Sequence, residues 1–408
     1  MRYDGVVVGG GPAGMMAAIT AASLGQSVLL IERNDRVGKK LLITGKGRCN
    51  VTNNCTVEEV LKNIPRNGRF LYSALNGFSP EDVIAFFEDR GCPLKTERGN
   101  RVFPVSDRAE SIADCLKREL NDVGVDILKD RAITICVENG KVTGVQCETK
   151  HISCDWLILA TGGLSYPTTG STGDGYRISK ALGHQIIPQE GSLVPLTSSN
   201  RDCAKMQGLS LRNVGVKLVD KNGKTLYKDF GELLFTHFGL SGPTILSASA
   251  HIKGDGCKVL IDLKPALDAP KLNERILRDL ETYRNRTMEN ALTDLLPRSM
   301  IPVVLDRLCV DPTLQANSFT KDQRSMLVDT LKAFSVEISG KRPVSEAIIT
   351  SGGICTVEIN PKTMESRIVK DLFFAGEIID CDAYTGGFNL QIAWSTAYAA
   401  GNAAASRW

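Results

Sequence analysis

The sequence has no apolar run long enough to cross a membrane, and its start lacks the pattern of a secretory signal. A membrane-spanning helix needs about 20 mostly apolar residues, but no stretch of this 408-residue chain approaches that length. Met1 to Asp4 lead directly into a predicted strand, without the apolar segment and cleavage site of a signal peptide. We therefore expect a cytoplasmic protein without membrane contact.

Close cysteine pairs are missing too. The chain has 12 cysteines, but no two of them form Cys-x-x-Cys, the spacing that zinc sites and dithiol redox centres usually need. We expect reduced, mostly buried thiols, no bound metal and no disulfide-reductase chemistry. There is also no Ser-His-Asp order, no His-Glu-x-x-His and no P-loop, so hydrolase and kinase functions have no support.

A glycine-rich turn near the N-terminus carries the strongest positive signal. Residues 3–8 read as a buried strand, residues 13–25 as a helix of small residues and residues 27–31 as a second strand. The turn contains Gly9, Gly11 and Gly14, the spacing that lets a backbone approach a pyrophosphate at a helix N-terminus. Glu32 ends the second strand, where an acid accepts hydrogen bonds from the ribose of adenosine.

Two later segments favour FAD over NAD. One predicted strand leads into Thr161 and Gly162, and another, residues 372–375, leads into Gly376 and Glu377. Both features recur in FAD proteins of the glutathione-reductase type. A final helix begins near Gly387, and its first N–H groups can face the flavin edge that becomes negative on reduction.

The middle of the chain differs from both ends in its hydrophobic periodicity. Residues 195–262 alternate with turn signals, which predicts a β-barrel or sandwich, and residues 269–335 show helical periodicity near 270–285, 288–308 and 321–334. Earlier, residues 125–150 read as an antiparallel meander. Residues 195–345 hold 22 Lys and Arg against 17 Asp and Glu, an excess of five positive charges that suits an anionic substrate or a solvated surface.

These residues together resemble the BaiN/YhiN-like flavoproteins, also described as aminoacetone-oxidase-like FAD enzymes. The matching stretches are Gly9–Gly14, Lys39–Asn53 (KKLLITGKGRCNVTN), Arg101–Pro104, Ala160–Ser165, Glu232–Pro243 (ELLFTHFGLSGP), Thr350–Ile354 and Gly376–Trp394 (GEIIDCDAYTGGFNLQIAW). Cys381 departs from the pattern, since an aliphatic residue is expected there.

The resemblance implies an α/β fold: a glutathione-reductase-like FAD-binding Rossmann domain with an inserted β-barrel-like domain and a nested helical domain. We place the FAD domain at residues 1–194 and 342–408, the barrel at 195–268 and the helical part at 269–341. The resemblance also implies that Thr44, Gly47, Arg48, Asn50 and Thr52 face the cofactor. The expected cofactor-binding residues are Gly9, Gly11, Pro12, Ala13, Gly14, Glu32, Arg33, Lys40, Thr44, Gly47, Arg48, Asn50, Thr52, Thr161, Gly162, Gly376, Glu377, Gly387, Phe388, Asn389 and Leu390.

The expected function is that of an FAD-dependent oxidoreductase, with NAD(P)H as a transient electron donor. Relatives are linked to reduction of C=C bonds, including steroid enones and a pyrimidine of ribosomal RNA, and to amine oxidation, and a fold cannot choose among these. We favour reduction of an activated C=C bond in a small molecule or an RNA base. An amine oxidase and a flavin-bound RNA- or protein-binding factor are the alternatives. Tyr384 and His237 are the candidate proton donors, and the oligomeric state stays open.

Overall fold

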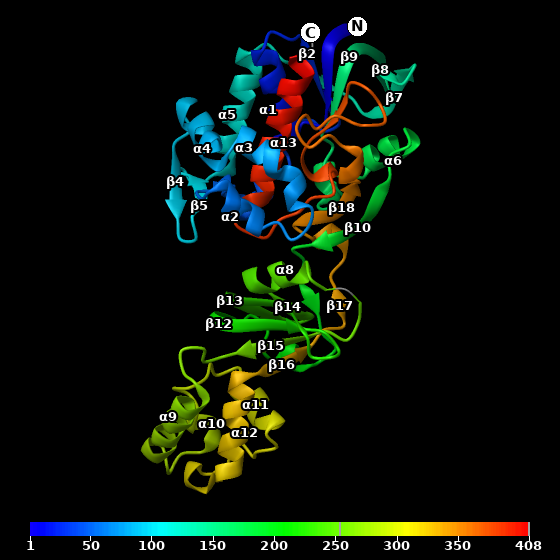
Figure 1. Cartoon of the computed structure of the whole chain (residues 1–408). Helices are drawn as coiled ribbons and strands as arrows, with labels where there is room; N and C mark the ends of the chain where they lie inside the picture. Colours follow the sequence, from blue (N-terminus) through cyan, green and yellow to red (C-terminus); the bar gives the residue numbers. More distant parts are fainter. Residues whose placement is uncertain (253, 407–408) are drawn as a thin grey trace. The chain divides into compact units, whose positions relative to one another are not determined.

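The computed structural model describes residues 1–252 and 254–406, and the chain divides into two compact units. Unit 1 comprises Met1–Ser192 and Val344–Trp408, and unit 2 comprises Leu193–Pro343 (Figure 1). The borders expected from the sequence, after residues 194 and 341, each lie two residues away from these. Unit 1 is therefore built from two pieces of the chain that are far apart in sequence.

A seven-stranded sheet forms the centre of unit 1. Its strands are β1 (Arg2–Val8), β2 (Val28–Glu32), β6 (Asp126–Lys129), β7 (Ala132–Glu138), β8 (Lys141–Cys147), β9 (His151–Leu159) and β19 (Leu372–Phe374). β1 pairs in parallel with β2 and β9, β2 with β6, and β9 with β19. Every residue of β2 and β19 is buried, as expected for strands covered on both faces.

The predicted meander over residues 125–150 is wrong at its start. Only β7 and β8 form an antiparallel hairpin, and β8 continues antiparallel to β9. β6 instead pairs in parallel with β2 and belongs to the Rossmann sheet. A short alternating run indicates a half-exposed strand, but it carries no information about which strand lies beside it.

Two helices of small residues pack closely against each other in unit 1. α1 (Pro12–Ser23) and α13 (Phe388–Ala405) are buried around most of their surfaces. A Cβ on Gly401 would lie 2.7 Å from the Ala17 carbonyl oxygen, so this approach requires glycine. The other helices are α2 (Val57–Lys62), α3 (Tyr72–Gly77), α4 (Pro80–Asp89), α5 (Ala109–Asp122) and α6 (Asp174–Ala181).

Two small antiparallel sheets complete unit 1. One contains β3 (Thr52–Asn53), β4 (Leu94–Glu97) and β5 (Arg101–Pro104), in the order β3-β5-β4. The other pairs β10 (Ile186–Ser192) with β18 (Ile349–Ile354).

Unit 2 contains a sheet whose ends meet. The strands are β11 (Leu196–Thr197), β12 (Ser210–Val219), β13 (Thr225–Thr236), β14 (Gly239–Ser241), β15 (Lys258–Asp262), β16 (Phe334–Glu337) and β17 (Gly340–Lys341). The order is β16-β15-β12-β13-β14-β11-β17, so the two end strands are consecutive in the chain. Between them, Ile338 N–H donates to the Cys257 carbonyl and Ser339 N–H donates to the Thr197 carbonyl. This continuous segment joins both edges, so the sheet is barrel-like.

Helices interrupt and follow the strands of unit 2. They are α7 (Asp202–Lys205), α8 (Pro243–Ser249), α9 (Ala269–Thr282), α10 (Met288–Ala291), α11 (Ile301–Arg307) and α12 (Lys321–Lys332). The sequence predicts short alternating strands over residues 195–262, but Pro243–Ser249 within this range form α8. The expected helix over 288–308 is broken between α10 and α11, where Pro297 cannot donate a backbone hydrogen bond within a helix. Pro302 lies in the first turn of α11, where a missing N–H is tolerated.

Candidate functional site

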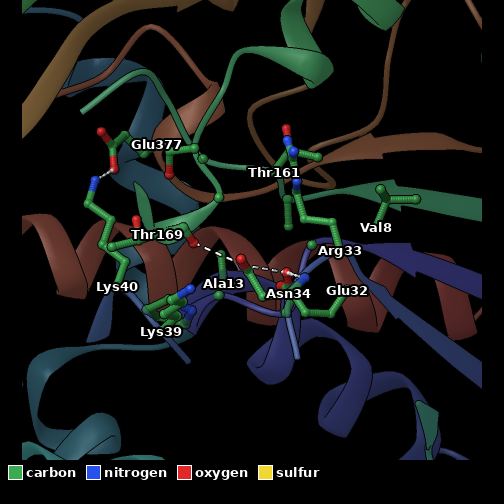
Figure 2. Close-up of a pocket in the computed structure, with 18 of the residues that line it drawn as sticks. Val8, Ala13, Glu32, Arg33, Asn34, Lys39, Lys40, Thr161, Thr169 and Glu377 are labelled. Atoms are coloured by element: carbon green, nitrogen blue, oxygen red, sulfur yellow. Dashed lines mark hydrogen bonds and ion pairs between the residues drawn. The ribbon is translucent and has the colours of Figure 1, made fainter. Parts of the chain in front are cut away.

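A large pocket opens in unit 1 where the parallel strands end. Its empty volume is about 1270 Å³, open solvent included. Val8, Ile31, Ala160 and Ala375, which lie at or just after the ends of four neighbouring strands, all line it. Open α/β sheets bind their ligands at this edge. Figure 2 shows charged and polar side chains gathered along the pocket.

The glycine turn shapes the middle of the pocket. Gly9 has a φ of +106°, and a Cβ there would lie 2.5 Å from the Ala160 carbonyl oxygen. A Cβ on Gly14 would lie 1.7 Å from the Gly9 carbonyl oxygen, so this glycine is needed for packing. Gly11 lines the pocket, and a Cβ there would meet nothing within 4 Å. A side chain at Gly11 would therefore fill the space where a ligand's phosphates can approach the backbone.

The N-terminus of α1 faces this space with positive charge. No side chain caps it, and its first turn contains no acid, so its N–H groups can hold an anion. Pro12, Ala13 and Lys39 line the pocket beside it. Lys39 forms no ion pair or hydrogen bond with the residues that the structure describes. The N-terminus of α1 and the Lys39 ammonium together fit a pyrophosphate. The sequence reading missed Lys39, although it stands beside the predicted Lys40.

Glu32 lies at one end of the pocket and holds the turn in place. Its buried carboxylate accepts hydrogen bonds from Gly10 N–H at 2.8 Å and from the backbone and side-chain amides of Asn34 at 2.8 and 2.7 Å. The Asn34 side chain also donates to the Thr169 carbonyl at 3.0 Å (Figure 2). A carboxylate has about four acceptor positions, so Glu32 retains capacity for ribose hydroxyls.

Two arginines and Asp174 form a charged cluster near Glu32. Arg131 donates two hydrogen bonds to the Asp174 carboxylate at 2.7 and 2.8 Å, and Arg33 approaches the same group at 3.2 Å. The Arg131 guanidinium lowers the pKa of Asp174 below its ordinary value. All three residues line the pocket, together with Asp130. Asp130 and Arg131 follow β6, so recognising β6 as a parallel strand would have pointed to them.

The other end of the pocket contains a network centred on Glu377. Lys40 Nζ lies 2.5 Å from Glu377 Oε2 and 2.7 Å from Ser165 Oγ. Glu377 Oε1 accepts from Ser165 Oγ at 2.8 Å and from Thr350 N–H at 2.9 Å. The side chains of Lys40 and Glu377 retain only 18 % and 13 % exposure, so this pair is largely desolvated. Ser165 and Thr350 were absent from the expected site, although both lie in stretches that carried the resemblance.

The start of α13 adjoins this network. Asn389 and Leu390, in its first turn, line the pocket, and no side chain caps the helix. The Asn389 side chain accepts from Ala383 N–H and donates to the Ala383 carbonyl, both at 2.8 Å. These two bonds hold the loop before the helix. The helix N-terminus therefore presents a positive dipole end to the pocket that Glu377 also lines.

Thr161 offers a further polar group. Thr161 and Gly162 line the pocket, and Thr161 Oγ1 is buried without a hydrogen-bond partner among the described residues. Buried hydroxyls normally have partners. The open Gly11, the uncapped α1, the unpaired Lys39 and this hydroxyl all fit a bound dinucleotide such as FAD.

Some expected cofactor residues are not among those that line the pocket. They are Gly14, Gly47, Arg48, Asn50, Thr52, Gly376, Gly387 and Phe388. Arg48 is held by the carboxylates of Glu97 and Asp107. Thr52 Oγ1 donates to Gln391 at 2.5 Å, and a Cβ on Gly387 would lie 2.4 Å from the Thr52 carbonyl oxygen. The two Thr52 contacts position the start of α13. Direct cofactor contact by all of these residues stays a prediction.

The two candidate proton donors lie in different units. Tyr384 is half-buried in the loop before α13, and its N–H donates to the Asn63 carbonyl at 3.0 Å. Tyr384 is not among the residues that line the pocket of unit 1. His237 belongs to unit 2, where its exposed side chain lies in the turn between β13 and β14. Proton donation by either residue remains a prediction.

A serine, a histidine and a glutamate form a hydrogen-bonded chain in unit 1, and none of the three lines the pocket. Ser366 Oγ lies 2.9 Å from His184 Nε2, and His184 Nδ1 lies 3.1 Å from Glu358 Oε2. Ser366 is 6 % exposed, and its oxygen accepts from the N–H groups of Ile368 and Val369. Because its oxygen is buried and already accepts two hydrogen bonds, Ser366 has a structural role and is not a nucleophile.

The buried thiols of Cys92 and Cys115 lie within hydrogen-bond reach of each other. All 12 cysteines are free, and no group of three or more metal-binding side chains occurs among the described residues. Burial raises the pKa of the Cys381 thiol well above its ordinary value, so Cys381 is an inert core residue. Within the part of the chain described, no helix combines the length and apolar character that a membrane span requires.

Comparisons with known proteins cover almost the whole chain. Residues 3–403 match the model of the HI0933-like protein Rossmann domain. The 3-dehydro-bile acid delta(4,6)-reductase of Clostridium scindens is 31 % identical, over 98 % of this chain and 98 % of that protein. The ribosomal RNA dihydrouridine synthase of Escherichia coli is 32 % identical, over 98 % of this chain and 97 % of that protein.

Solved structures show the same fold at lower identity. The 3-ketosteroid delta1-dehydrogenase of Sterolibacterium denitrificans superposes with a TM-score of 0.55 at 13 % identity, over the full length of both chains. The predicted α/β Rossmann fold is therefore confirmed.

Proposed function

Since the chain belongs to the HI0933-like Rossmann family and is an FAD-dependent oxidoreductase, we propose that it reduces an activated C=C bond with electrons from NAD(P)H. The observation that carries this proposal is the charge arrangement at the Glu377 end of the pocket. The uncapped N-terminus of α13 and the Lys40 ammonium both supply positive potential to the pocket, and the Glu377 carboxylate there is already paired with Lys40.

The printed names of two full-length relatives support the direction of the reaction. One relative is named a reductase of a bile-acid derivative, and another a synthase of dihydrouridine in ribosomal RNA. Both names describe saturation of a C=C bond in a conjugated ring. Since both cover about the same length as this chain, we extend this reaction type to it, with a small conjugated molecule or an RNA pyrimidine as the substrate class.

FAD, when bound, supplies the exchange of a hydride between its N5 atom and a carbon held against the ring. The chain supplies orientation and electrostatic bias. Gly11 and α1 leave room for a pyrophosphate, Glu32 can accept from ribose hydroxyls, and α13 favours negative charge by roughly 0.3–1 kcal/mol, or about 2 kcal/mol if partly buried.

The proton that completes the reduction must come from an acid near the substrate. Tyr384 is our first candidate and His237 our second. We expect Tyr384→Phe and His237→Ala to slow reoxidation of the enzyme by a conjugated alkene while leaving FAD affinity unchanged. Tyr398, on α13, stacks on Phe78 with ring centroids 4.5 Å apart. Tyr398→Phe keeps that stacking and removes only a hydroxyl, so it is the matched control for Tyr384→Phe.

The electron donor is tested by anaerobic stopped-flow mixing of the FAD-loaded protein with NADH and with NADPH. We expect one nicotinamide to bleach the flavin absorbance near its visible maximum at a rate that saturates with concentration. The reduced protein should then convert an added conjugated enone or uridine to its saturated product, detected by mass. Failure of both nicotinamides to reduce the flavin would refute the proposed donor.

A further inference from the structure

The β12–β13 hairpin of unit 2 places two like charges directly opposite each other. In the antiparallel register, Lys217 pairs with Lys228, and both side chains are exposed. Directly opposite residues have Cβ atoms about 4.5–5.5 Å apart, and like charges at this distance destabilise a sheet. Neither lysine forms an ion pair or hydrogen bond with any residue that the structure describes. The repulsion is therefore not relieved within the chain.

An exposed aromatic ring lies on the same face. Phe230 follows Lys228 by two residues, so both side chains point to the same side of β13, and 57 % of Phe230 is exposed. Its cross-strand neighbour is Gly215, which has no side chain to cover the ring. We call Lys217, Lys228, Phe230 and Gly215 the hairpin patch. The hairpin is visible in Figure 1.

The charges around the hairpin patch add to its positive potential. The hairpin also carries Arg212, Lys221 and Lys224, all exposed. Four carboxylates lie on the hairpin or beside it, those of Asp220, Asp229, Glu232 and Asp262, and each already has a partner. Asp220 accepts from Lys224 N–H, and Asp229 accepts from the Tyr227 hydroxyl, both at 2.9 Å. Glu232 accepts from Ser210 Oγ at 2.8 Å, and Asp262 pairs with Lys332 at 2.6 Å.

We propose that the hairpin patch binds single-stranded nucleic acid, with a base stacked on Phe230 and backbone phosphates held by Lys217 and Lys228. An aromatic ring flanked by unpaired cations is the arrangement that binds such strands without sequence preference, since every base has a face that can stack. Anionic lipid would use the lysines but not require an aromatic ring. The inference does not depend on the reaction proposed above, because the patch would bind a strand whatever the flavin does.

The test uses the full-length, FAD-loaded protein and a fluorescein-labelled single-stranded RNA of about 12 nucleotides, within the range of known site sizes. Anisotropy titrations at several salt concentrations give the dissociation constant and its salt slope. We expect Phe230→Ala and Phe230→Leu each to weaken binding by roughly tenfold, and Phe230→Trp to retain it. Lys217→Gln and Lys228→Gln should each lower the salt slope by about 0.7.

Matched controls are available in the same unit. Leu277→Ala removes an exposed apolar side chain, and Lys271→Gln removes an exposed lysine on α9. Both should bind RNA like the wild type. Thermal unfolding of each variant checks that the fold is retained.

Three outcomes would overturn the inference: no RNA binding by the wild type, equal binding by the hairpin variants and the wild type, or binding of phosphatidylserine vesicles without RNA binding. Reduction of a small enone should be unchanged in the Phe230 variants. If RNA binds through the patch but its pyrimidines are not reduced, the docking surface stands and the RNA-base substrate fails.

Discussion

The ammonium nitrogen of Lys40 lies 2.5 Å from Oε2 of Glu377, although 337 positions separate the two residues in the sequence. Lys40 follows β2 in the first piece of unit 1, and Glu377 follows β19 in the second. The pair therefore joins the two sequence pieces at the pocket. It also fixes a carboxylate and an ammonium group where the cofactor and substrate are proposed to meet.

We predict that this pair couples the stability of the two pieces. Lys40→Met and Glu377→Gln should each lower the free energy of unfolding by about 1–3 kcal/mol, because each leaves a largely buried polar partner without its hydrogen bond. In a double-mutant cycle followed by urea unfolding, the coupling should be about 0.5–3 kcal/mol. The exposed pair Lys62–Glu59 is the control, expected to couple by no more than about 0.5 kcal/mol. Equal coupling in the two cycles would contradict this prediction.

Gly11 and Gly14 should respond in opposite ways to alanine. Gly11→Ala should leave the stability of the FAD-free protein nearly unchanged, because its Cβ meets no atom, yet weaken FAD binding at least tenfold. Gly14→Ala should destabilise the fold itself, since its Cβ would overlap the Gly9 carbonyl oxygen. Thermal unfolding of the FAD-free protein and titration with FAD separate the two effects. A Gly11→Ala variant with normal FAD affinity would show that the phosphates lie elsewhere.

Glu32→Ala should weaken FAD binding by roughly 1–3 kcal/mol, because Gly10 N–H and the Asn34 amide lose their acceptor and any ribose hydroxyl loses one too. Flavin fluorescence on dilution measures the dissociation constant. Asp35→Ala, which removes an exposed acid three residues away, should have no effect. The prediction fails if both variants bind FAD with wild-type affinity.

His184 should make stability depend on pH. Burial lowers its pKa below the ordinary value, although Glu358 partly opposes the shift. The unfolded chain therefore binds a proton at His184 more readily than the folded chain does. As a result, the free energy of unfolding has its full value above about pH 6.5 and decreases as the pH falls toward the folded pKa. The contribution to the slope is at most about 1.4 kcal/mol per pH unit.

Chemical denaturation between pH 5 and 8 checks this, with His184→Gln expected to show a shallower slope than the wild type. His151→Gln, at an exposed position, should keep the wild-type slope. Identical slopes for the wild type and His184→Gln would mean that other groups account for the pH dependence.

The sequence predicted the elements whose patterns are local. The strand–glycine–helix unit, the strand before Gly376 and the last helix all appear where the periodicity and the glycines placed them. The same information could not show that β6 pairs with β2, because pairing is a long-range property. The local pattern also does not predict that α8 interrupts the strands of unit 2.

The site residues also divide into those that local patterns predict and those that depend on long-range contacts. Glu32 and Glu377 could be placed because each follows a recognisable strand. Lys39, Ser165 and Thr350 could not, because their roles depend on which loops meet at the pocket. For Arg48, the motif predicts cofactor contact, and the structure shows its guanidinium paired with Glu97 and Asp107. The cofactor contact of Arg48 stays a prediction.

The direct test of the central claim is the rate at which the reduced protein is reoxidised. One anaerobically reduced sample is mixed in parallel with a conjugated enone, with uridine, and with oxygen, and the return of the oxidised flavin spectrum is followed. We expect a conjugated C=C acceptor to reoxidise the protein faster than oxygen does at equal concentration, with formation of the saturated product. If oxygen is the only efficient acceptor, and a primary amine reduces the flavin quickly, the protein is an amine oxidase and the account is wrong.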